Sequence, residues 1–98
     1  MSLSLRIRPE TEQDLAEARD WYERRRDGLG NEFLTAVEEV FDRIREFPES
    51  YAAAYRSVRR AGLRRFPYVV YYRLSGRNVE VLAVLHGSRH PSAWRSRA

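Results

Sequence analysis

Two apolar runs joined by a four-residue turn constrain the fold of this chain more than any other feature. The first run, Tyr68–Leu74, is rich in aromatic and β-branched residues, and the second, Val79–His86, is apolar except for Glu80 and the final histidine. Such residues favour strands. The intervening Ser75-Gly76-Arg77-Asn78 has the composition of a hairpin turn. The pattern predicts two neighbouring antiparallel strands, the second of which is central or covered on both faces.

Two other segments have features of strands. Leu3–Arg8 alternates apolar and polar residues and stops at Pro9, which cannot donate a hydrogen bond within a sheet. Tyr55–Leu63 is predicted as a further strand, in which Gly62 marks a bulge or an early turn. The prediction is therefore a sheet of four strands.

Between the first and second of these strands, two segments have helical periodicity. The first helix is predicted from an N-cap at Thr11 to about Asp27, and the second over about residues 31–47, where Pro48 ends it. A short joint at Leu29-Gly30 makes them antiparallel neighbours. The expected buried positions are Leu15, Ala18, Trp21 and Tyr22 in the first helix and Phe33, Val37, Val40, Phe41 and Ile44 in the second.

The predicted order is β-α-α-β-β-β, which places the chain in the α+β class. We expect a helical hairpin packed on one face of an antiparallel sheet. The length of 98 residues is typical of a single domain, so residues 1–98 are predicted to form one.

Charge is divided unevenly along the chain. Residues 1–49 hold 8 Arg and 13 acidic residues, a net charge of −5, whereas residues 50–98 hold 10 Arg and only Glu80, a net charge of +9. A basic half of this kind attracts an anionic partner. All 18 basic residues are Arg, which suits planar contacts to carboxylate or phosphate, although genomic base composition also explains an Arg-for-Lys bias.

Several functional classes are disfavoured by composition. The chain has no cysteine, which excludes a disulfide scaffold and cysteine-type zinc sites. It has no apolar run of the ~20 residues that span a bilayer, and its first residues lack the apolar core of a signal peptide. We therefore expect a cytoplasmic protein without a membrane partner, a metal or a cofactor.

The densest basic run is the first candidate for binding. It comprises Arg56, Arg59, Arg60, Arg64 and Arg65. Strand alternation puts Arg59 opposite Arg56 and Arg60, so the five cannot all face one partner. Part of the run is predicted to contact a target or a partner protein; the alternative is a solvated strand face whose arginine stems cover apolar surface.

His86 and Arg89 are the second candidates, because they could bind phosphate or transfer protons. The alternative is that His86 pairs locally at the strand end and that Arg89 pairs with an acid of the helical hairpin. His86 and His90 alone are too few ligands for a metal site.

The order and spacing of these segments resemble a known family. A strand, a helical hairpin with a Gly-Leu-Gly joint, the strand Phe66–Tyr72 and the ending Val81–Pro91 are similar to RelE/ParE toxins of type II toxin–antitoxin modules. The ending His86-Gly87-Ser88-Arg89-His90-Pro91 is closer to the ParE-like, plasmid-stabilisation branch. The resemblance implies a growth-inhibiting toxin that binds DNA gyrase and that a cognate antitoxin neutralises in a hetero-oligomer. The alternative is the activity of the RelE branch, ribosome-dependent cleavage of messenger RNA.

The residues of RelE-type cleavage are only partly present. Arg89 matches the arginine after the last strand, but Tyr68 replaces the arginine that begins the tyrosine-rich strand, and Trp94 lies near the place of the tail tyrosine. Enzymatic activity is therefore left open, with binding favoured and Arg89 and His86 as the catalytic candidates. The residues expected to bind the target or the antitoxin are Arg56, Arg60, Arg64, Arg65, Arg73, Arg89 and Trp94.

Overall fold

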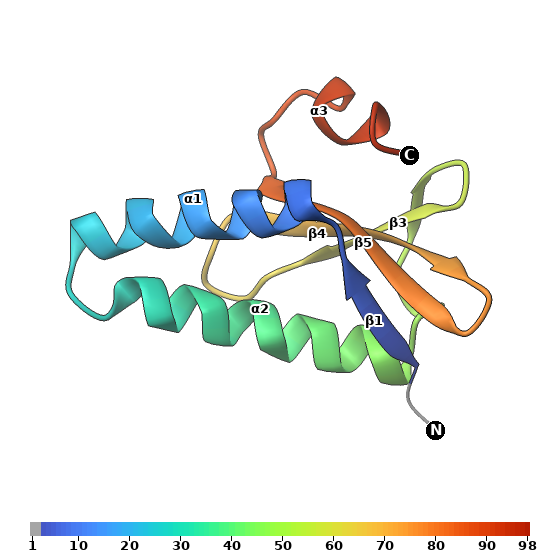
Figure 1. Cartoon of the computed structure of the whole chain (residues 1–98), viewed down its shortest axis with the longest axis horizontal. Helices are drawn as coiled ribbons and strands as arrows, with labels where there is room; N and C mark the ends of the chain where they lie inside the picture. The colour runs from blue at the N-terminus through green and yellow to red at the C-terminus, as the bar shows by residue number, and fades with distance from the viewer. Residues whose placement is uncertain (1–2) are drawn as a thin grey trace.

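The computed structural model describes residues 3–98. Two long helices lie against one face of a five-stranded sheet, and a short C-terminal helix lies beyond the opposite face (Figure 1). The elements are β1 (Ser4–Ile7), α1 (Pro9–Arg25), α2 (Leu29–Glu46), β2 (Ala53–Tyr55), β3 (Val58–Gly62), β4 (Tyr68–Ser75), β5 (Asn78–His86) and α3 (Ser92–Arg95). The predicted α+β class, with a helical hairpin on a sheet, is confirmed. In this part of the chain, no helix combines the length and the apolar character needed to cross a bilayer.

The predicted β4–β5 hairpin lies inside the sheet, whose strand order is β1-β5-β4-β3-β2. Its turn is the predicted one, with Ser75 opposite Asn78 and Gly76 at a φ of 61°. The prediction of a wholly antiparallel sheet was wrong, because β1 runs parallel to β5. Residues 8–77 connect these two strands, and a connection of that length allows either direction.

The segment predicted as one strand, Tyr55–Leu63, is in fact two strands. Strand β2 ends at Tyr55, the chain reverses, and β3 begins at Val58, which pairs with Tyr55. Arg56 makes the reversal possible with a φ of 52°. Few residues other than glycine adopt this left-handed conformation, so the composition did not mark the turn.

Helix α2 buries the predicted apolar stripe. Its stripe residues are at most 2% exposed: Phe33, Val37, Val40, Phe41 and Ile44. The helix begins at Leu29, earlier than predicted, and Gly30 lies where it meets α1. A Cβ atom on Gly30 would approach the carbonyl oxygen of Arg19 to 2.9 Å, so glycine allows the close crossing of the two helices.

The prediction for α1 was wrong at Trp21, which is 44% exposed. The next residue, Tyr22, takes the buried position and packs its ring against Phe33 and Phe66, with centroid distances of 5.3 and 4.9 Å. Successive residues of a helix differ in direction by about 100°, so burial of Tyr22 turns Trp21 toward the rim.

Thr11 was predicted as the N-cap of α1, but the helix already begins at Pro9 and Thr11 is fully buried. Its Oγ1 donates to the carbonyl oxygen of Val81 at 3.1 Å, and a carboxylate oxygen of Asp14 accepts from the N–H of Val84 at 3.1 Å. Since β1 pairs with β5 only as far as Val81, these side chains satisfy the backbone of β5 where the neighbouring strand has ended.

The C-terminal tail completes this junction. The guanidinium of Arg97 donates to both carboxylate oxygens of Asp14, at 2.6 and 3.2 Å, and to the carbonyl oxygen of Leu82 at 3.1 Å. The carbonyl oxygen of Arg97 in turn accepts from Arg8 at 2.6 Å. Asp14 thus joins α1, β5 and the tail through one carboxylate, whose side chain is 8% exposed.

We predict that Asp14→Ala lowers the free energy of unfolding by about 2–3 kcal/mol, because it leaves the Val84 N–H and Arg97 without their acceptor. Asp14→Asn should lose less, since an amide oxygen still accepts from Val84. Glu12→Ala, on the exposed side of the same helix, should change stability by no more than about 0.5 kcal/mol. Urea denaturation measures all three, and equal effects of Asp14→Ala and Glu12→Ala would contradict the junction.

Candidate functional site

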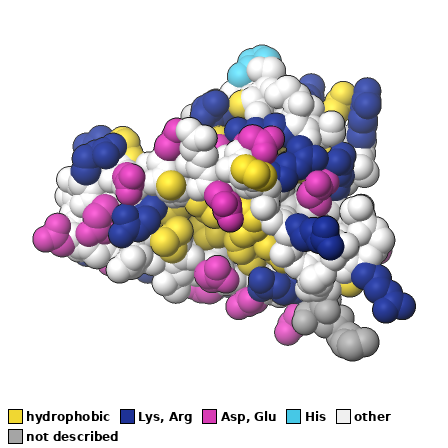
Figure 2. Space-filling view, viewed as in Figure 1, with side chains coloured by type: hydrophobic (Ala, Val, Ile, Leu, Met, Phe, Trp, Pro, Cys, Tyr) yellow, Lys and Arg dark blue, Asp and Glu magenta, His cyan; other side chains and the backbone are white. Residues whose placement is uncertain are grey.

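The sheet face opposite α1 and α2 carries an excess of arginine. Residues paired across strands share a face, so Arg6 and Arg73 lie beside Glu80, and Arg60 lies beside Tyr71. In Figure 2, arginines gather toward the end of the molecule where α3 and β3 lie, while acidic side chains are spread over the helices. The charge asymmetry of the sequence is thus also an asymmetry in space.

Glu80, the one acidic residue after Glu49, neutralises part of this face. Its carboxylate accepts from the Nε of Arg73 at 2.7 Å and from the Nε of Arg8 at 3.2 Å. Burial opposes ionisation of Glu80, but the hydrogen bonds from Arg73 and Arg8 prevail and lower its pKa below the usual 4.5. Arg73, one of the predicted binding residues, therefore already has an acidic partner.

Three other arginines of this face rest on aromatic rings. The guanidinium carbons of Arg56 and Arg95 lie 5.1 and 4.6 Å from the ring centroid of Tyr55, and that of Arg60 lies 5.9 Å from the ring of Tyr71. We call Arg56, Arg60 and Arg95 the arginine cluster. All three are exposed, and none forms an ion pair with an acidic residue among residues 3–98. A cation–π contact uses the face of the guanidinium, so its N–H groups stay available to an anion.

Trp94, another predicted binding residue, supports this cluster from beneath. Its ring stacks on Tyr71 with a centroid distance of 4.5 Å and an interplanar angle of 14°, and only 5% of the residue is exposed. Arg95, its neighbour, was not singled out from the sequence. The one local signal was its place beside a tryptophan in a basic tail.

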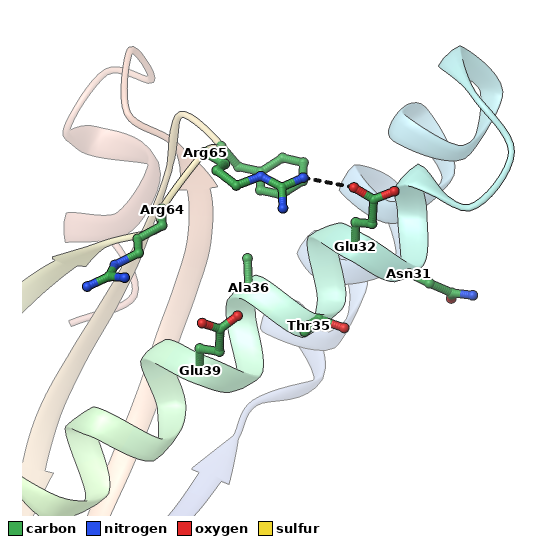
Figure 3. Close-up of a pocket in the computed structure, with 8 residues that line it drawn as sticks. Asn31, Glu32, Thr35, Ala36, Glu39, Arg64 and Arg65 are labelled. Atoms are coloured by element: carbon green, nitrogen blue, oxygen red, sulfur yellow. Dashed lines mark hydrogen bonds and ion pairs between the residues drawn. The ribbon is translucent and has the colours of Figure 1, made fainter.

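Arg64 and Arg65 lie elsewhere, beside a pocket of about 420 Å³ between α2 and the β3–β4 loop (Figure 3). Arg65 donates to Glu32 at 2.8 Å, and Glu32 also accepts from Arg26 at 2.8 Å. These hydrogen bonds, first from Arg26 and then from Arg65, lower the pKa of Glu32. Four arginines of the predicted basic run are thus divided between two surfaces, with Arg56 and Arg60 in the arginine cluster and Arg64 and Arg65 beside this pocket.

The two catalytic candidates line different pockets. His86 pairs locally, as its alternative interpretation expected: its Nδ1 accepts from the N–H of Ser88 at 3.0 Å, so the neutral ring carries its proton on Nε2. Its ring contacts Tyr68 and lines a pocket beside α1. Arg89 lines the neighbouring pocket with Arg97, Glu10 and Glu17, and it forms no ion pair within residues 3–98.

Tyr68, which stands where the RelE pattern has an arginine, is half-buried between α1 and His86. Burial raises the pKa of its hydroxyl, and the nearby charge of Arg89 opposes this only in part. Residues 3–98 contain no group of three or more His, Cys, Asp or Glu side chains placed to hold a metal ion.

Comparison with known proteins identifies the family. Residues 5–91 match the family model described as the ParE toxin of type II toxin–antitoxin system, parDE. The chain belongs to the ParE toxin family. It is also 33% identical over 94 residues to Toxin ParE2 of Mycobacterium tuberculosis, in two strains, which covers 95% of this chain and 90% of that protein.

Solved structures share the fold of this ParE-family toxin. A chain of the chromosomal ParDE toxin–antitoxin system of P. aeruginosa superposes with a TM-score of 0.63 at 19% identity, covering 87% of this chain and 96% of its own. A chain of the RelBE2 toxin–antitoxin complex of Mycobacterium tuberculosis gives 0.64 at 22% identity, covering 88% and 99%. The predicted RelE/ParE resemblance and its ParE-like branch are therefore confirmed.

We predict that Glu80→Gln lowers stability at pH 7 by about 1 kcal/mol, because the ion pairs with Arg8 and Arg73 are lost. Since the pKa of Glu80 is lowered on folding, its charge stabilises the folded state above about pH 4.5. That contribution disappears as the pH falls below 4.5 through the folded pKa. The two proteins should therefore converge in stability on acidification, as followed by urea denaturation from pH 7 to about pH 3.

Glu38→Gln is the matched control, because Glu38 is exposed on α2 and forms no ion pair among the described residues. It should follow the parent protein across the whole range. A stability deficit of Glu80→Gln that stays constant down to pH 3 would contradict the role of its ion pairs.

Proposed function

We propose that this ParE-family toxin inhibits growth by binding a target protein, DNA gyrase, and that a cognate antitoxin neutralises it. Gyrase is the target that the family resemblance implies. The antitoxin is supported by the similar solved structures, which belong to the ParDE and RelBE2 toxin–antitoxin assemblies of their own organisms. This toxin is then half of a hetero-oligomer in the cell and acts when the antitoxin is removed.

The arginine cluster is the observation that carries the binding proposal. Three exposed guanidiniums without acidic partners repel one another, and this repulsion is relieved when an anionic surface covers them. Their aromatic supports hold them in place before binding, which reduces the entropy that is lost on association. A planar guanidinium also matches a carboxylate in bidentate geometry. We infer that an acidic segment of the antitoxin or of the target docks on Arg56, Arg60 and Arg95.

Binding is favoured over RNA cleavage by the surroundings of the candidate catalytic groups. Cleavage requires groups that activate a 2′-hydroxyl and protonate the leaving oxygen. Trp94 cannot transfer a proton and is stacked on Tyr71. The Nδ1 of His86 is engaged by Ser88, and the raised pKa of Tyr68 disfavours its use as a base. Messenger-RNA cleavage through Arg89 is the alternative function.

We predict that expression of the toxin without its antitoxin arrests growth. The purified toxin should inhibit supercoiling by purified gyrase. Transcript 5′ ends, mapped in the same cells, should show no new cuts. If new cuts appear at codon-linked positions while supercoiling is unaffected, the RelE-type alternative is correct. If co-expression of a candidate antitoxin, encoded by a small gene next to the toxin gene, fails to restore growth, the proposed neutralisation is wrong.

We also predict that the double variant Arg56→Glu and Arg60→Glu weakens binding of the antitoxin or the target at least tenfold and flattens its salt dependence. The matched control is Arg24→Glu with Arg77→Glu. It makes the same change in charge at exposed arginines, away from the cluster, that have no ion pair in residues 3–98. Isothermal titration with each purified partner at two salt concentrations separates the two interfaces. Equal losses for both double variants would show a general charge effect and contradict docking at the cluster.

A further inference from the structure

The pocket beside α1 that His86 lines is on the sheet face opposite the arginine cluster, where α1 crosses the start of β4 and the end of β5. It has a volume of about 500 Å³ and is lined by Glu17, Trp21, Tyr22, Pro67, Tyr68 and His86. Four of these six residues present aromatic rings, and one presents a carboxylate. Neither the arginine cluster nor the pocket beside Arg64 and Arg65 contributes to it.

Neighbouring rings of this lining meet in edge-to-face contacts. Trp21 meets Tyr22 at 5.0 Å and 90°, Tyr22 meets Tyr68 at 5.9 Å and 62°, and Tyr68 meets His86 at 5.5 Å and 70°. The ring of His86, whose Nδ1 accepts from the N–H of Ser88, is the fourth aromatic ring of the lining. Aromatic rings that line a pocket offer π faces to an organic cation.

The charge of α1 favours the same kind of ligand. The helix carries six acidic residues and three arginines, and Glu17 places its carboxylate at the pocket itself. The carboxylate of Glu17 forms no ion pair within residues 3–98, and its one hydrogen bond there is from the side chain of Gln13, at 3.3 Å. Two cations lie near the pocket without lining it: Arg25, beside Trp21, and Arg89, which lines the adjoining pocket together with Glu10 and Glu17.

Trp21 already attracts one cation in the folded chain. The guanidinium carbon of Arg25 lies 4.1 Å from the centroid of its ring. Arg25 is not among the residues that line the pocket, so it does not fill the space between Trp21, Tyr68 and Glu17. The residue Trp21 is 44% exposed, so its ring is accessible to a ligand in the pocket.

We propose that this aromatic pocket binds the head group of an organic cation, a guanidinium or an alkylammonium, with Glu17 as its counter-ion and Trp21 as its main aromatic wall. The cation comes either from an arginine or lysine side chain of a partner or from a free amine, and the chemistry is the same. The inference does not depend on the target or the antitoxin proposed above. It gives the toxin two recognition surfaces of opposite preference, one for anions on the sheet face and one for cations beside α1.

The 98-residue chain offers a direct readout, because its sequence contains two tryptophans. Trp21 lines the pocket and Trp94 is buried on the opposite face, so the indole N–H signals of the two residues form a probe and an internal reference. We expect ethylguanidinium, n-butylammonium and choline to shift the Trp21 signal, with dissociation constants on the order of millimolar. The Trp94 signal should stay in place. The ranking of the three cations then distinguishes an arginine, a lysine and a methylated amine as the natural source.

Neutral and anionic probes of similar size test the charge requirement. The neutral isostere of choline, 3,3-dimethylbutanol, should bind about 5- to 30-fold more weakly, which corresponds to the usual strength of a cation–π contact. Propionate should not bind. Equal binding of choline and dimethylbutanol would overturn the proposal in favour of a merely apolar pocket, and tighter binding of propionate would reverse its sign.

Substitutions identify the groups responsible, with the backbone amide of His86 as the reporter. Trp21→Leu should weaken choline binding about 5- to 30-fold, whereas Trp21→Phe should retain most of it because a π face remains. Glu17→Gln should weaken binding several-fold, and Glu12→Gln, an exposed acid of α1 outside the pocket, should have no effect. Since Trp21 and Glu17 are exposed, these variants are expected to fold, which circular dichroism checks. Unchanged binding in both Trp21→Leu and Glu17→Gln, or no Trp21 shift with any of the three cations, would overturn the proposal.

Discussion

The carboxylate of Asp14 is the interaction on which the arrangement of this protein depends. It accepts hydrogen bonds from the backbone of β5 and from Arg97 in the tail, while its own residue belongs to α1. These bonds are needed because β1 stops pairing with β5 at Val81, and a buried backbone group without a partner is destabilising by roughly 1–3 kcal/mol. Side chains from α1 and the tail therefore form hydrogen bonds with the β5 backbone where β1 no longer pairs with it. These bonds also hold α1 and the tail against the sheet.

The position of the tail follows from this junction and decides the chemistry of the sheet face. With Arg97 held at β5, Trp94 stacks on Tyr71, and Arg95 reaches the ring of Tyr55 that Arg56 also contacts. The proposed anion-binding surface is thus assembled from three parts of the chain that are distant in sequence. The acidic helix α1 and its aromatic pocket lie on the other side of β5. The sheet consequently separates a surface suited to anions from one suited to cations.

The order of apolar, polar and turn residues predicted those elements whose formation depends on neighbouring residues in the sequence. The β4–β5 hairpin and the stripe of α2 were predicted correctly because their periodicity and turn residues agree with their burial. Predictions were wrong where tertiary contacts prevailed. Thr11 has the side chain of an N-cap residue, but its hydroxyl donates to the carbonyl oxygen of Val81. Tyr22 occupies the buried position of α1, so Trp21 is exposed. Arg56 turns the chain in a left-handed conformation that its residue type does not predict.

In the candidate site, too, some features follow from residue order and others depend on tertiary contacts. The excess of arginine in the second half of the chain, the replacement of RelE-type residues by Tyr68 and Trp94, and the family were all accessible from residue order. Which arginines remain without an acidic partner was not. Arg73 is paired with Glu80 and Arg65 with Glu32, whereas Arg56, Arg60 and Arg95 rest on aromatic rings. Formal charge is a property of composition, but neutralisation depends on strand register and on where the tail is anchored, and only the folded chain brings those groups within reach of one another.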